Sequence, residues 1–133
     1  MNIPRIMELK MSGLCCSQII MKMGLEGLGR GNEDLIKAMA GLCDGMHKGS
    51  TCGTISAAVC LLYMIDKEKA GRLADEIWDW FEDSFGSTEC NTLIEGNPLK
   101  KTQICGDLVE NTYLKLLEIF EDNNIAFDAH ESY

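Results

Sequence analysis

The chain has 133 residues, 46% of them hydrophobic, which fits one globular domain over residues 1–133 with a single core. Its formal net charge of −9 argues against nucleic acid or an anionic membrane as a partner, because both are bound through clustered Lys and Arg. The longest apolar run, residues 55–65, is too short to cross a bilayer, and no secretion signal is recognisable, so we expect a cytoplasmic protein.

The N-terminal third shows apolar residues at helical spacing. Pro4 can open a first helix, and a second begins near Leu14 with Cys16 on its apolar stripe. Asn32 is a suitable N-cap for a third, short helix that ends in the glycines of residues 41–45.

The segment 51–65 is predicted to be the central helix. Residues 55–65 are apolar almost all round, as expected of a helix buried within a bundle. Ser50 or Thr51 can cap this helix, which places Cys52 in its first turn. Unpaired backbone N–H groups and the helix dipole lower the pKa of a thiol there. We interpret Cys60, eight residues further on, as a buried and inert core residue on the same face.

Two further helices are predicted in the C-terminal half. Residues 73–85 form an amphipathic helix, and Cys90 lies in a short helical turn. Thr102 can cap a long helix whose apolar stripe starts at Cys105. Because no segment has the period of a strand, we predict an all-α, single-domain bundle of about five helices around the buried central one.

The cysteines are the main chemical signal. The chain has seven of them, and an odd number without a secretion signal argues against a purely structural disulfide framework. Four fall early in a predicted helical segment, and at least three of these lie on its apolar stripe: Cys16, Cys52, Cys90 and Cys105. We therefore predict that these four converge on one partly buried site, although no two of them form a Cys-x-x-Cys motif.

The residues leave the chemistry of that site open. Four thiolates can hold an iron–sulfur cluster or another metal, or can cycle between dithiol and disulfide. Cys43 can add a resolving thiol or an extra ligand, and His47 can add a ligand or a base, although an exposed loop histidine is the more common case. We interpret Cys15 as a bystander, because adjacent side chains diverge on a helix.

The cysteine pattern also carries a resemblance that covers most of the chain. The matching segments are residues 15–18, the glycine-rich 41–49, 52–57, 90–93 and Cys105. The pattern resembles that of the C_GCAxxG_C_C family of putative redox-active proteins, with Thr54 and Ala57 in place of the family's usual Ala and Gly. This family is similar to the cysteine-bearing domain of split-Soret cytochromes, but the chain lacks Cys-x-x-Cys-His for haem attachment. The resemblance implies a helical four-cysteine redox site.

Three functions follow as hypotheses. The leading one is a redox protein that uses the four cysteines for electron transfer or thiol chemistry with an unknown protein partner. The second is a module that binds or senses a soft metal, and the third is a structural interaction subunit whose cysteines only pack. A homodimer is compatible with each, and the sequence leaves open whether the protein is an enzyme.

Overall fold

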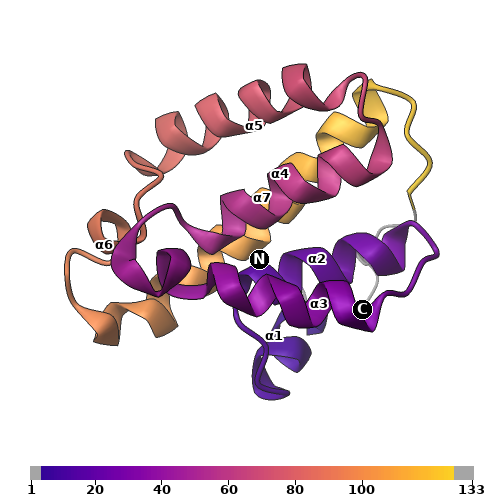
Figure 1. Ribbon diagram of the computed structural model, residues 1–133. Coiled ribbons are helices and arrows are strands. Elements are labelled where there is room, and N and C mark those ends of the chain that lie inside the picture. Colours follow the sequence, from indigo (N-terminus) through magenta and orange to yellow (C-terminus); the bar gives the residue numbers. More distant parts are fainter. Residues whose placement is uncertain (1–3, 128–133) are drawn as a thin grey trace.

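The computed structural model describes residues 4–127, in which helices joined by loops and turns form the fold (Figure 1). The α-helices are α1 (Pro4–Met11), α2 (Cys16–Gly27), α3 (Glu33–Met39), α4 (Gly53–Ile65), α5 (Ala70–Phe85), α6 (Cys90–Leu93) and α7 (Lys101–Asp122). Short helical turns lie between them: η1 (Ala40–Leu42), η2 (Gly45–Gly49) and η3 (Pro98–Lys100).

The all-α prediction is confirmed for the described residues, which contain an isolated bridge between Thr51 and Glu89 but no strand. The predicted count of about five helices is too low, since these residues form seven α-helices. None of the described helices combines the length and the apolar character that crossing a bilayer requires.

Helix α4 is the centre of the bundle. Figure 1 shows it between α5 on one side and α2 on the other, and it also packs against α7. Its side chains Ile55, Leu61 and Leu62 are at most 1% exposed. Burying an aliphatic side chain of this size contributes about 1.5–3 kcal/mol to the stability of the fold, so these buried side chains make α4 an important part of the core.

One side of α4 nevertheless faces outward, and the start of the helix lies later than predicted, so two predictions are wrong. Cys60 is exposed and not buried, as is Tyr63 one turn later. Eight residues exceed two helical turns by about 80°, so Cys60 does not continue the direction of Cys52. Moreover, Cys52 is the N-cap of α4 with non-helical backbone angles, so it precedes the first turn that was predicted to contain it.

Local capping fixes the starts of α2 and α3. Cys15 is the N-cap of α2, and its backbone N–H donates to the side-chain oxygen of Gln18 at 3.2 Å. The predicted N-cap Asn32 is confirmed, because its side-chain oxygen accepts from the Leu35 N–H at 3.0 Å. Cys16 is consequently the first residue of α2, with its position set by a capped helix end.

Candidate functional site

Four thiols, located in or directly before four different helices, line one small cavity. Cys16 and Cys90 are the first residues of α2 and α6, Cys52 precedes α4, and Cys105 lies in the second turn of α7. The cavity has a volume of about 20 Å³, which is room for about one water molecule. We name it the thiol cavity. The four predicted cysteines therefore lie together, while their chemical role stays a prediction.

Hydrogen bonds between two loops bring Cys52 and Cys90 to this cavity. The Cys52 N–H donates to the Thr88 carbonyl at 2.7 Å, and the Cys90 N–H donates to the Ser50 carbonyl at 2.6 Å. These bonds join the loop before α4 to the loop before α6. Residues 38 positions apart in the sequence (90 − 52) are thus held side by side by backbone groups.

Gly53, the first residue of α4, allows the start of this helix to lie close to α2 and to the turn η1. A Cβ atom at this residue would lie 3.2 Å from the Cys16 sulfur and 2.7 Å from the Leu42 carbonyl oxygen. The second distance is shorter than any normal contact, and its partner is backbone that cannot rotate away. The glycine is therefore required by the geometry of the site.

We predict that Gly53→Ala destabilises the fold by about 1–3 kcal/mol and displaces Cys16, because a methyl group overfills the space beside its sulfur. The matched control is Gly41→Ala, since a Cβ at Gly41 meets no atom within 4 Å. Chemical denaturation of both variants measures the effect. An equal change in the free energy of unfolding for the two variants would contradict the close-packing argument.

Cys52 is the activated thiol of the site. Its pKa is lowered from the ordinary value of 9.0 to about 6, and the largest cause is a hydrogen bond from the Cys16 thiol. Burial opposes this shift, while the backbone N–H groups of Thr54 and Ile55 reinforce it. These groups therefore favour the thiolate form of Cys52, although only 4% of the residue is exposed.

The other three thiols stay protonated in the presence of this thiolate. The hydrogen bond to Cys52 is the largest cause that raises the pKa of Cys16, followed by burial and by the negative charge of Cys52. Burial is the largest cause of the raised pKa of Cys90. It is also the largest cause of the raised pKa of Cys105, which is about 11. The site thus contains one thiolate and a thiol that donates to it.

Cys15 and Cys43, whose pairing was not predicted, form a disulfide beside the site. Their Cα atoms are 6.1 Å apart, and 28 residues separate them. The buried Ser17 hydroxyl lies 3.2 Å from the Cys15 sulfur and 3.4 Å from the Cys43 sulfur, and donates to the Met39 carbonyl at 2.7 Å. The disulfide connects the start of α2 to the loop that leads to Cys52. Cys15 is consequently no bystander, and Cys43 is no free ligand or resolving thiol in this state.

We predict that Cys15→Ser/Cys43→Ser loses about 2–4 kcal/mol of stability, because the closed loop no longer restricts the unfolded chain. Each single serine variant should lose a similar amount, since either one removes the same bond. Denaturant titration without reductant tests this. A wild type and double variant of equal stability would mean that the disulfide contributes nothing to the fold.

His47 lies outside the thiol cavity. It is exposed, its backbone adopts a left-handed conformation, and its Nε2 atom lies 3.1 Å from the Ala40 carbonyl oxygen. The residue lines a neighbouring surface pocket with Asp44 and Cys90, both of which also line the thiol cavity. This placement agrees with the exposed loop histidine that the sequence favoured.

A metal or iron–sulfur centre requires several ligands in one coordination shell, about 2.3 Å from the metal when they are sulfurs. Within residues 4–127, no three or more Cys, His, Asp or Glu side chains are grouped so that they could hold a metal ion. The four thiols as placed do not fit such a centre.

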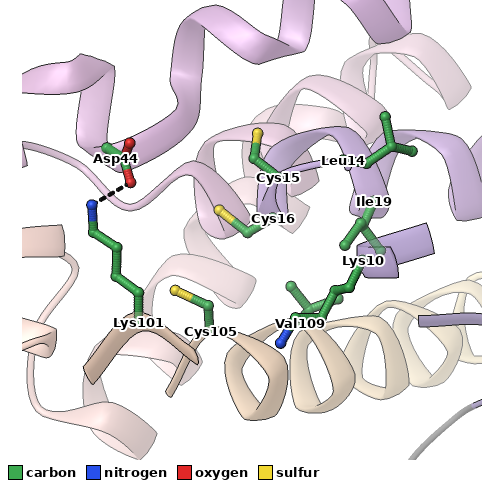
Figure 2. A pocket seen from close by; sticks show the side chains of 9 residues that line it. All are labelled: Lys10, Leu14, Cys15, Cys16, Ile19, Asp44, Lys101, Cys105 and Val109. Atoms are coloured by element: carbon green, nitrogen blue, oxygen red, sulfur yellow. Dashed lines mark ion pairs between the residues drawn. The ribbon is translucent and has the colours of Figure 1, made fainter. Parts of the chain in front are cut away.

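A larger pocket opens beside the thiol cavity, and Figure 2 shows its lining side chains. It has a volume of about 220 Å³ and shares Cys16, Asp44 and Cys105 with the thiol cavity. At one side the Lys101 ammonium pairs with the Asp44 carboxylate at 2.6 Å, which raises the pKa of Lys101. This pocket could not be predicted from the sequence, because its residues come from α1, α2, α7, the segment between α1 and α2, and the loop at Asp44.

Comparison with known proteins supports a redox role. The family model described as "Putative redox-active protein (C_GCAxxG_C_C)" matches residues 14–119, a range that includes every cysteine of the chain. No curated protein and no solved structure matches the chain.

Proposed function

Because the chain belongs to the C_GCAxxG_C_C family of putative redox-active proteins, we propose that it performs thiol–disulfide exchange, with Cys52 as the nucleophile and Cys16 as the resolving thiol. The observation that supports this most is that Cys16 and Cys52 line the same small cavity, where the neighbouring Cys16 thiol favours the thiolate form of Cys52. A thiolate is the reactive form in exchange, and a neighbouring thiol completes the reaction.

The first step is attack by the Cys52 thiolate on one sulfur of a substrate disulfide. A new S–S bond forms between Cys52 and that sulfur while the substrate S–S bond breaks. The electron pair of the broken bond leaves on the second substrate sulfur, which takes a proton from solvent. The product of this step is a mixed disulfide on Cys52.

The second step uses Cys16, whose pKa depends on the state of Cys52. Once Cys52 is a neutral mixed disulfide, the hydrogen bond and the charge that raise the pKa of Cys16 are gone. Cys16 then attacks the Cys52 sulfur, and its proton passes to the departing substrate sulfur. Overall, one substrate disulfide becomes two thiols while the Cys16–Cys52 dithiol becomes a disulfide.

Trapping experiments with single serine variants test this order. With the neutral hydroxyethyl disulfide, Cys16→Ser should stop at a mixed disulfide on Cys52, because no resolving thiol remains. Cys52→Ser should trap nothing at that position, and the wild type should yield a Cys16–Cys52 bond in peptide mass spectra. Cys60→Ser is the control, since Cys60 is exposed on the outer side of α4. Accumulation of the mixed disulfide on Cys60 alone would contradict the proposal.

A second candidate is a soft-metal or iron–sulfur site at the same four cysteines. The convergence of four thiols on one cavity favours it, and the absence of a metal-holding group among the described residues weighs against it. The metal content and the visible spectrum of anaerobically purified protein test it. About one equivalent of metal, lost in both Cys16→Ser and Cys90→Ser, would favour this candidate over thiol exchange.

A further inference from the structure

The pocket of about 220 Å³ beside the thiol cavity has the form of a small-molecule site. We name it the Lys10 pocket. Leu14, Ile19 and Val109 form an apolar wall, and the thiol-bearing residues Cys16 and Cys105 line it as well. Its volume is below the roughly 300 Å³ at which pockets for drug-sized ligands begin, so a small ligand fits it best.

The charges in this pocket do not cancel. Lys101 is paired with Asp44, whereas Lys10 forms no ion pair with a carboxylate among the described residues. The Lys10 ammonium nitrogen lies 3.4 Å from the position of a Cβ on Gly106, beside Cys105. The residues that line the pocket therefore carry about one excess positive charge, in a chain whose formal net charge is −9, while the Cys52 thiolate lies in the adjoining thiol cavity.

The Lys10 pocket also adjoins the thiol cavity. It shares three lining residues with the thiol cavity, which Cys52 lines. In Figure 2 the side chains of Cys16 and Cys105 lie between the Lys101–Asp44 ion pair and the apolar wall at Ile19. A ligand in this pocket therefore contacts Cys16, whose partner Cys52 lines the adjoining thiol cavity.

We propose that the Lys10 pocket binds a small aliphatic disulfide that carries a carboxylate, with the carboxylate at Lys10 and a sulfur atom directed toward the Cys16–Cys52 pair. This inference rests on the proposed thiol exchange and adds the class of its substrate. The methylene groups of such a ligand pack on the apolar wall, and Lys10 supplies the charge that a carboxylate requires. The exchange consumes the disulfide and releases two carboxylate-bearing thiols, while Cys16 and Cys52 become joined in a disulfide.

Binding is tested first with thiodipropionate, a dicarboxylate thioether that has no S–S bond and so cannot exchange. Calorimetry should detect binding to the wild type that weakens at least about fivefold in Lys10→Gln, because one charge pair near a protein surface contributes about 1 kcal/mol or more. Lys67→Gln is the matched control, since it makes the same charge change at an exposed turn between α4 and α5. Equal affinity for the Lys10→Gln and Lys67→Gln proteins would overturn the assignment.

Reactivity is tested with three small disulfides that differ in charge: dithiodipropionate, the neutral hydroxyethyl disulfide and cystamine. We expect Cys52 to react fastest with the anion and slowest with the cation, with about fivefold between successive members at low salt. The differences in rate between the three disulfides should decrease as ionic strength rises, because salt screens the charge of Lys10. The Lys10→Glu variant should reverse the order of the rates.

The outcomes separate the two proposals. Reaction of Cys52 with all three disulfides at equal rates would overturn the anionic substrate class and leave thiol exchange intact. If none of the three reacts at Cys52, thiol exchange fails, and the redox role of the Lys10 pocket fails with it.

Discussion

Replacing Cys16 with alanine is expected to slow the alkylation of Cys52 at pH 7 by at least about tenfold, because it removes the largest cause of the low Cys52 pKa. Without the donated hydrogen bond, burial dominates and the pKa moves back toward 9.0. The fraction of thiolate at pH 7 then falls by about one order of magnitude for each pKa unit. Mass-spectrometric mapping of the modified peptide measures the rate at Cys52 alone.

Cys16→Ser is the conservative partner of this variant. Its hydroxyl can still donate to the thiolate, so the rate at Cys52 should lie between those of the wild type and Cys16→Ala. Unfolding midpoints verify that both variants fold. If the alanine variant retained the wild-type rate, Cys16 would have no part in activating Cys52.

The second large effect is on the pH dependence of stability. In the folded protein the pKa of Cys52 is about 6, against 9.0 for an ordinary thiol, so between these pH values the unfolded chain binds a proton that the folded state does not. Stability therefore rises with pH across this window, by up to about 1.4 kcal/mol per pH unit. The stabilisation from Cys52 is lost as the pH falls toward 6.

Above pH 9 the direction reverses. The pKa of Cys16 is raised in the folded state and that of Cys105 is raised to about 11, so the folded protein keeps protons that the unfolded chain has released. Stability falls as the pH rises, and the curve has its maximum near the ordinary thiol pKa.

The measurement is denaturant unfolding at a series of pH values, in a Cys15→Ser/Cys43→Ser background kept reduced so that no disulfide rearranges. Adding Cys52→Ser to this background removes the thiolate and its effect on Cys16. The variant should lose the rise between pH 6 and 9 and part of the fall above it. An identical pH profile with and without Cys52 would show that this thiol has no shifted pKa.

Much of this fold could be predicted from the sequence, because the relevant forces are local. The N-cap at Asn32 and the central helix predicted from the apolar run of residues 55–65 depend on short-range sequence patterns. The structure contains both the N-cap and a central helix with buried side chains. The exposed position of Cys60 was missed because an almost wholly apolar segment does not show which face is outward. That face is decided by the helices that pack against α4.

The site could be predicted only in part. The positions of Cys16 and Cys52 near the starts of predicted helices indicated that both belong to the site. The hydrogen bonds between the loops that carry Cys52 and Cys90 are tertiary contacts without a sequence signal. The Cys15–Cys43 disulfide was missed for a similar reason, since connectivity among several cysteines does not follow from their spacing. Lys10 was missed because charge patterning cannot show which lysine lies over a pocket.

The most direct test of an activated Cys52 is its alkylation by iodoacetamide at graded pH, with each cysteine peptide quantified by mass spectrometry. Exposed Cys60 in the same molecule serves as the internal reference. The hydrogen bond from Cys16 predicts that modification of Cys52 rises with a midpoint near pH 6. A midpoint near the ordinary thiol pKa of 9.0, with the same profile at Cys60, would contradict the thiol pair as the functional centre.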